Sequence, residues 1–217
     1  MNPIVVVGIF AGLVLSLGGC GISQFQTLII FDSPDRVVAL RVMPDAYGGQ
    51  GFDHPASFTV EEMSDLLRGV RVQRGLLSSI SHAALSEGEV RLFSPYFVEA
   101  LQQATNEEMV TFFETAEING DYQLTTSGGL FVAGGNFHFV LSNFSVKTPL
   151  WQDNEQYEAS YRSRPLEQMD PQPGGLFYEP RQFMVKSPEG EIGSHWKGKP
   201  WQVAIRYQDV LRKENIN

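Results

Sequence analysis

Cysteine is almost absent from this chain. One cysteine, Cys20, occurs among 217 residues, so the polypeptide can form no internal disulfide. The four histidines show no H-x-x-x-H or H-E-x-x-H spacing, the common sequence signatures of a zinc site. We therefore expect no bound metal.

Signatures of hydrolases and nucleotide-binding proteins are also missing. The chain has no G-x-S-x-G elbow and no phosphate-binding loop, and Gly8-Ile9-Phe10 breaks the G-x-G-x-x-G pattern of a dinucleotide site. The fragment closest to a catalytic pair is Asp53-His54-Pro55, where a carboxylate could orient an imidazole, although adjacent residues more often build a turn. We expect no catalytic residue and no cofactor.

Basic residues are scarce in the middle of the chain. Between Arg91 and Lys147 there is no Lys or Arg, and the formal net charge of the whole chain is −9. Phosphate backbones repel an acidic protein that lacks a basic patch. We therefore expect no nucleic-acid partner.

Charged side chains are absent from residues 1–19. Ile4 to Leu17 is an apolar run interrupted only by Gly8, Gly12 and Ser16. A comfortable transmembrane helix needs about 20 apolar residues, so this run better suits the apolar region of an export signal. It ends in Leu17-Gly18-Gly19-Cys20.

These four residues resemble the lipobox of bacterial lipoproteins, although the chain start lacks the Lys or Arg that the family normally carries. The resemblance implies that residues 1–19 are a signal peptide. Cleavage would leave Cys20 as the first residue, with diacylglycerol on its sulfur and usually an acyl chain such as palmitate on its amine. Gly21 is not the Asp that often favours inner-membrane retention, which implies an outer-membrane protein facing the periplasm. An uncleaved membrane anchor is the alternative.

The linker after Cys20 is short. Residues 20–26 form the lipidated N-terminus and linker, and strand character begins at Thr27. Seven residues extend at most roughly 25 Å. We expect residues 27–217 to form a single domain that sits close to the bilayer.

The order of the predicted elements indicates an α+β fold, with a largely antiparallel sheet and two or three helices. Residues 27–31 and 36–42 predict two strands joined by a turn. Thr59 and Glu62 form a capping box before a helix that ends at Gly69, and Ser94-Pro95 indicates the start of another helix.

The C-terminal half predicts mostly strands. Gly134-Gly135-Asn136 indicates a hairpin turn, and the alternation after it places His138 on the exposed face of its strand. A long proline-rich loop is expected near residues 148–180. The segments RQFMVK and WQVAIRY predict closing strands, and VLRKENIN a frayed end.

Aromatic and arginine residues mark candidate contact surfaces, because exposed Trp, Tyr and Arg are enriched at protein interfaces. The candidates for binding a partner are Trp151, Tyr157, Tyr161, Arg162, Trp196 and Trp201. The alternative is that the aromatic residues of the long loop pin it to the sheet. Trp196 and Trp201 flank two lysines, a composition that suits lipid headgroups or simply the end of a hairpin.

The sequence favours a lipid-anchored envelope protein that is not an enzyme. We expect it to bind another envelope protein or to help an envelope assembly. One alternative is an envelope hydrolase or carbohydrate-active enzyme that uses His54 with nearby acids. A second alternative is a carrier of a small apolar ligand.

Overall fold

The computed structural model describes residues 26–43, 46–75, 80–150, 161–170, 173–185 and 201–214. The predicted signal peptide and Cys20 lie outside this part of the chain, as do Trp151, Tyr157 and Trp196. The first described strand begins at Gln26, six positions after Cys20.

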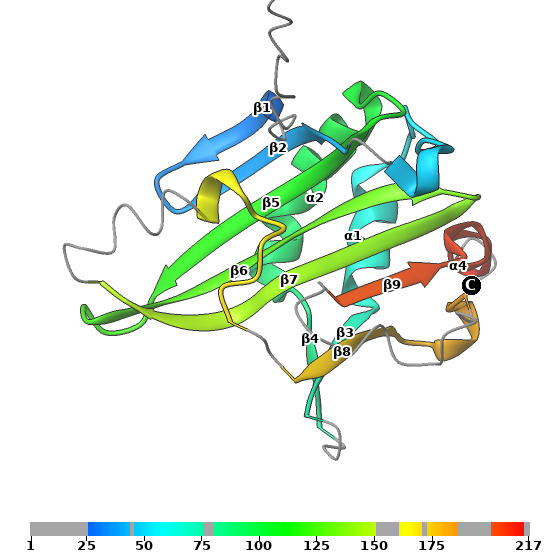
Figure 1. The fold of residues 1–217 in the computed structure, drawn as a ribbon. Coiled ribbons are helices and arrows are strands. Elements are labelled where there is room, and N and C mark those ends of the chain that lie inside the picture. Colours follow the sequence, from blue (N-terminus) through cyan, green and yellow to red (C-terminus); the bar gives the residue numbers. More distant parts are fainter. Residues whose placement is uncertain are drawn as a thin grey trace, which may run out of the picture.

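A six-stranded antiparallel sheet forms the centre of the molecule (Figure 1). Its strands are β1 (Gln26–Ser33), β2 (Arg36–Val42), β5 (Glu108–Glu117), β6 (Tyr122–Ala133), β7 (Asn136–Pro149) and β9 (Trp201–Ile205). They lie side by side in the order β1-β2-β5-β6-β7-β9. Strand β1 therefore lies at one edge of this sheet and β9 at the other.

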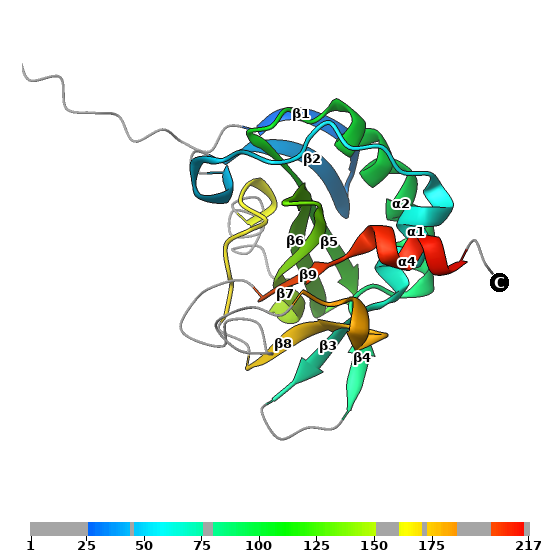
Figure 2. The same cartoon turned by 90° about the vertical axis from the view of Figure 1, so that its right-hand side faces the viewer.

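A second, three-stranded sheet has the order β4-β3-β8. It consists of β3 (Val70–Arg74), β4 (Ser81–Ala83) and β8 (Gly174–Tyr178). Strand β8 contacts β9, and the views in Figures 1 and 2 place this small sheet at the end of the molecule away from β1. Both sheets are antiparallel throughout, and the predicted α+β class is confirmed.

Helices cover one face of the large sheet (Figure 2). They are α1 (Val60–Arg68), α2 (Glu87–Gln103) and α4 (Tyr207–Glu214), with short 3-10 helices at Ala46–Gly49 and Arg181–Phe183. The capping box at Thr59 and Glu62 is confirmed, because each side chain bonds the backbone N–H of the other residue. Gly69 ends α1 with φ −75°, and a Cβ there would lie 2.3 Å from the ring of Tyr178. The glycine is therefore required for close packing rather than for a left-handed turn.

The predicted start of the second helix is wrong. Helix α2 begins at Glu87, and its capping box is Ser86 with Glu89, about two turns before Ser94-Pro95. Ser94 lies inside the helix and is fully buried, where its hydroxyl donates to the Val90 carbonyl at 2.7 Å. This hydroxyl has an acceptor of its own within the helix, so it does not act as a cap.

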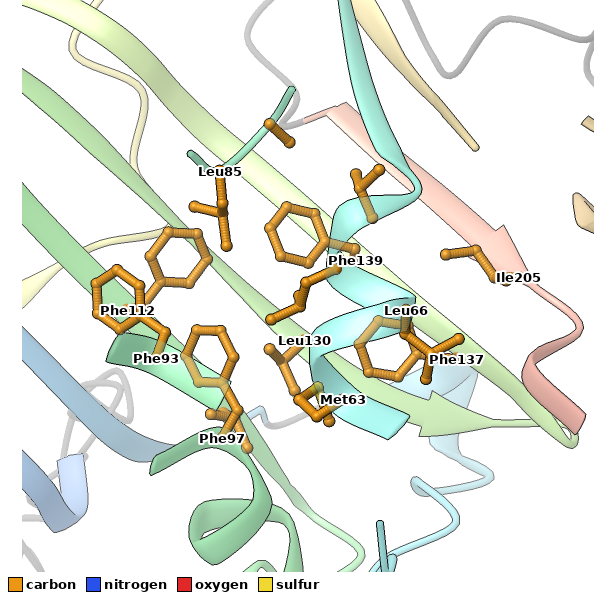
Figure 3. Packing of buried hydrophobic residues seen from close by; sticks show 14 of the residues in the cluster. Met63, Leu66, Leu85, Phe93, Phe97, Phe112, Leu130, Phe137, Phe139 and Ile205 are labelled. Atoms are coloured by element: carbon orange, nitrogen blue, oxygen red, sulfur yellow. The ribbon is translucent and has the colours of Figure 1, made fainter. Parts of the chain in front are cut away.

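The main core fills the space between the helices and the sheet (Figure 3). Phe93 and Phe97 of α2 stack with ring centroids 5.3 Å apart, and both contact Phe112 of β5. Phe137 and Phe139 of β7 point into the same layer and are fully buried. Full burial of one such ring stabilises the fold by about 1.5–3 kcal/mol.

The hairpin turn is confirmed, but the exposure of His138 is not. Gly134 and Gly135 both have positive φ, 57° and 70°, between β6 and β7. Both faces of β7 are covered, and His138 is 5% exposed because residues of the 3-10 segment and of β6 pack on its face. The alternation along β7 therefore divided its side chains correctly between the two faces of the sheet. It predicted wrongly that the face carrying His138 is exposed to solvent.

The C-terminal predictions need three corrections. RQFMVK contains a 3-10 helix and one isolated bridge, Met184 to Ile205, rather than a strand. The segment VLRKENIN falls largely within α4, and the start of that helix packs on the core through Val210. The long loop is shorter than expected, because β7 extends to Pro149 and β8 occupies Gly174–Tyr178.

Candidate interaction edge

The outer edge of β1 is the most unusual surface of the described chain. β1 hydrogen-bonds to β2 on one side, and no described strand pairs with its other side. The opposite edge of the sheet is different: Val185 donates its N–H to the Ala204 carbonyl at 2.9 Å, beside the bridge from Met184 to Ile205. An unpaired strand edge presents a row of N–H and C=O groups to another chain.

The side chains of β1 are apolar where the edge is exposed. Leu28 is 41% exposed and Ile29 is 48% exposed. Leu28 pairs with Leu40, which belongs to the helix-side core, whereas Ile29 pairs with Ala39, which belongs to the cluster on the other face. Cross-strand partners share a face, so apolar surface flanks the edge on both sides of the sheet.

Two β-bulges interrupt this strand. The register shifts between Gln26 and Leu28, and again between Ile29 and Phe31. Bulges bend and twist an edge strand and restrict indiscriminate pairing with other chains. Regular pairing with β2 covers Leu28 and Ile29 between the two bulges and resumes from Phe31 to Ser33.

Several contacts hold β1 rigidly against the domain. Phe31 stacks on Tyr96 of α2, with ring centroids 4.2 Å apart. The Thr27 hydroxyl donates to the carboxylate of Glu108 at the start of β5. Burial raises the pKa of Glu108, but the hydrogen bonds from Thr27 and Thr105 lower it by more. The net shift of this pKa is downward, so the charged carboxylate is the favoured form. The edge is thus a preformed surface.

Arg162 bonds the end of β1 and the turn after it from the face of the sheet opposite the helices. Its guanidinium donates to the carbonyls of Ser33 at 2.6 Å and Arg36 at 3.1 Å, and to the carboxylate of Asp32. A further bond reaches the Pro34 carbonyl at 3.2 Å. Arg162 was predicted to bind a partner, but its donors are engaged within the domain, where they fasten the turn between β1 and β2.

The segment 161–170, yellow in Figure 1, crosses the face opposite the helices. Tyr161 packs against the cluster of Val37, Ala39 and Phe113. Asn143 donates to the Ser127 hydroxyl and to the Glu167 carbonyl, both at 2.8 Å, and accepts from the Met169 N–H at 2.8 Å. These contacts favour the interpretation that the aromatic loop is pinned to the sheet.

The Arg162→Ala variant is expected to lower the free energy of unfolding by about 1–2 kcal/mol, because it removes several charged hydrogen bonds from a partly exposed site. Thermal denaturation should show a Tm lower by about 2–8 °C. Arg164→Ala is the matched control, because Arg164 lies in the same segment and forms an exposed pair with Glu167. Its expected effect is within about 0.5 kcal/mol. Equal Tm values for the two variants would show that Arg162 does not fasten the turn.

Trp201 requires a correction. It was predicted to bind a partner, but it is 4% exposed and belongs to the main core. A Cβ at Gly174 would come within 3.1 Å of its ring, so β8 packs directly on it. Its side chain is therefore not available at the surface.

His54 forms a backbone clamp. Its Nδ1 lies 2.9 Å from the Glu108 carbonyl oxygen, and its Nε2 accepts from the Val132 N–H at 3.0 Å. A carbonyl only accepts, so the proton is on Nδ1 and the ring is neutral. Burial lowers the pKa of His54. The last pair between β5 and β6 at this end is Val110 with Leu130, and continuing the pairing would place Glu108 opposite Val132. The His54 ring lies between the Glu108 carbonyl and the Val132 N–H and bonds both.

Asp53 and His138 also bond backbone groups at the turn between β6 and β7. The Asp53 carboxylate accepts from the Gly135 N–H at 2.9 Å and so supports the hairpin turn. His138 is similarly engaged: its Nε2 is 3.2 Å from the Ala133 carbonyl, and its Nδ1 is 2.9 Å from the Gln202 amide. With both ring nitrogens bonded within the domain, neither histidine is placed to act as a general base.

The described residues contain no group of three or more His, Cys, Asp or Glu side chains that could hold a metal ion. None of the helices in this part of the chain is long and apolar enough to cross a bilayer. No protein-family model, curated protein or solved structure matches the chain. Its function must therefore be argued from its own residues.

Proposed function

We propose that this protein is a lipid-anchored envelope protein that binds an extended segment of another envelope protein along β1. The outer edge of β1 carries this proposal, because it combines backbone groups that no described strand pairs with and apolar side chains on both faces. Strand addition uses such an edge: main-chain hydrogen bonds give affinity and neighbouring side-chain contacts give selectivity.

The position of the edge in the chain supports a partner at the membrane. β1 begins six positions after Cys20, a distance of at most about 20 Å in an extended chain. If Cys20 is acylated, as the lipobox resemblance implies, the edge lies near the bilayer from which the anchor extends. We therefore expect the partner to be a membrane-associated protein with an extended apolar segment.

The charge of the strand fits an apolar partner. Asp32 is the only charged side chain in β1, and its carboxylate is already bonded to Arg162. The stretch from Thr27 to Phe31 offers no charge to a partner. Proteins often place charges on edge strands to prevent pairing, and this strand has none along its exposed centre.

The Ile29→Lys variant tests the proposal, because a charge at the centre of the edge would be buried unpaired against a docked strand. We expect at least about tenfold less partner to co-purify from detergent-solubilised membranes, which corresponds to about 1.4 kcal/mol. Ile118→Lys is the matched control: Ile118 is 49% exposed, lies after β5 and is not on the edge strand. Tm values should show that both variants remain folded.

A partner set that Ile29→Lys leaves unchanged would exclude β1 as the binding edge. Recovery of only a differently tagged copy of this chain would show self-pairing and would also contradict the proposed partner. Loss of the partner in both variants would assign the effect to surface charge rather than to the edge.

A further inference from the structure

We propose that Glu89 and Glu114 share a single proton, and that this proton holds the first turn of α2 on the sheet as a pH-sensitive contact. This inference does not depend on the proposed binding at β1. It rests on two adjacent carboxyl groups, a buried one from β5 and a partly buried one from the helix, which we call the carboxyl pair.

Glu114 lies where a carboxylate has few donors. It is 4% exposed, on the helix-facing side of β5. One oxygen, Oε1, accepts from Arg36 Nε at 2.7 Å, and Arg36 is its direct cross-strand neighbour in β2. The other oxygen, Oε2, is buried and accepts no hydrogen bond from the residues that the structure describes.

Glu89 approaches Glu114 from the first turn of α2. The two carboxyl groups are within hydrogen-bonding reach of each other. Two carboxylates cannot hydrogen-bond without a proton, whereas one carboxyl and one carboxylate form a strong charge-assisted bond. A single proton therefore satisfies the buried Oε2 atom and removes the repulsion between helix and strand.

The surroundings place the proton on Glu114. Burial and the adjacent Glu89 raise the pKa of Glu114 to about 8, although Arg36 opposes this shift. Burial also raises the pKa of Glu89, but its hydrogen bonds from Glu114 and Ser86 and the charge of Arg36 outweigh this, and the net shift is downward. Glu89 therefore remains the anion that caps α2, and Glu114 donates to it.

The charged groups around the pair are few. Arg36 faces it from β2 and also bonds Asp35 in the turn before that strand. Glu89 is the charged group that α2 contributes. Thr126, the neighbour of Glu114 in β6, is uncharged. Once the proton leaves above neutral pH, the single positive charge of Arg36, which is already shared with Asp35, must balance both carboxylates of the pair.

The expected effect follows from proton linkage. The folded pair retains a proton between about pH 5 and pH 8, where unfolded glutamates have released theirs. The stabilisation that this proton provides is complete below the ordinary glutamate pKa of the unfolded chain. It is lost as pH rises through the raised pKa of Glu114 in the folded protein. The unfolding equilibrium constant should therefore increase by up to about tenfold per pH unit across this window.

The Glu114→Gln variant tests the shared proton. A glutamine can accept from Arg36 and donate to Glu89 at every pH, so its Tm should stay nearly constant between pH 7 and pH 9, whereas the Tm of the wild-type protein should fall. Restricting the range to values above pH 7 avoids the titration of histidine. Glu117→Gln is the control, because Glu117 lies exposed on the same strand and should keep the wild-type pH dependence.

A second measurement does not depend on the stability of any variant. In the wild-type protein, ¹³C NMR of glutamate carboxyl groups should show one resonance that titrates near pH 8 and is absent from Glu114→Gln. Titration of every carboxyl below about pH 6 would overturn the proposal. So would equal pH dependence of Tm in Glu114→Gln and wild-type protein.

Discussion

The Cys20→Ser variant is expected to lose its lipid and to accumulate as an uncleaved precursor. The hydroxyl of serine cannot replace the thiol that receives the diacylglycerol in proteins with this signal. Each buried methylene of an acyl chain contributes about 0.8 kcal/mol to membrane binding, so two or three chains on Cys20 would anchor the wild-type protein stably. This is the largest change in location that a single substitution should cause in the chain.

Mass spectrometry of the purified protein is the decisive measurement. The wild-type protein should begin at Cys20 and carry the mass of the acyl groups, and Cys20→Ser should retain residues 1–19 without added lipid. Ser23→Ala, three positions after the cysteine, is the control and should be processed as wild type. A wild-type protein that retains its first 19 residues would identify an uncleaved anchor and contradict lipidation.

The first helix and the turn between β6 and β7 could be predicted because local chemistry determines them. The capping box at Thr59 and the two glycines at Gly134 and Gly135 act within a few residues, and both were identified correctly. Ser86 and Glu89 form the same capping pattern, but Ser94-Pro95 was also a plausible start. Ser94 is instead bonded to Val90 and Ser64 inside the core, a tertiary contact that the sequence does not reveal.

The roles of the candidate site residues could not be predicted, because they depend on contacts between distant segments. Arg162 was expected to face a partner, but its acceptors lie about 130 positions earlier, at Asp32 and Ser33. Trp201 follows two lysines in the sequence and still lies in the core. A composition typical of interfaces is also the composition that holds a loop on a sheet.

The edge position of β1 and the contact between Glu89 and Glu114 both depend on how distant segments of the chain pack. Nothing within residues 26–33 shows that β1 has one neighbour rather than two, since the strand order results from the whole sheet. The absence of charge in TLIIF was the available signal, and it is equally typical of a central strand. Glu114 and Glu89 lie 25 positions apart, and only the packing of α2 on β5 brings them together.

The His54→Ala variant is expected to lower the free energy of unfolding by about 2–5 kcal/mol. The substitution leaves the Glu108 carbonyl and the Val132 N–H without their partner in a partly buried position, and each such loss costs about 1–3 kcal/mol. His54→Gln should recover part of this loss, because its amide can donate to the carbonyl and its oxygen can accept from the N–H. Urea denaturation of the three proteins measures the effect.

The two hydrogen bonds of His54 also predict that the folded state is less stable in acid. Because burial depresses the pKa of His54 in the folded state, the unfolded chain binds the proton first, and stability is lost as pH falls from about 6.5 through the folded pKa. A protonated ring would direct a donor at the Val132 N–H, which has no means of accepting it. His54→Gln should therefore be less sensitive to acid than the wild type between pH 7 and pH 5. If His54→Ala instead kept wild-type stability and abolished a hydrolytic activity of the purified protein, the imidazole would be a catalytic group and the clamp would be the wrong interpretation.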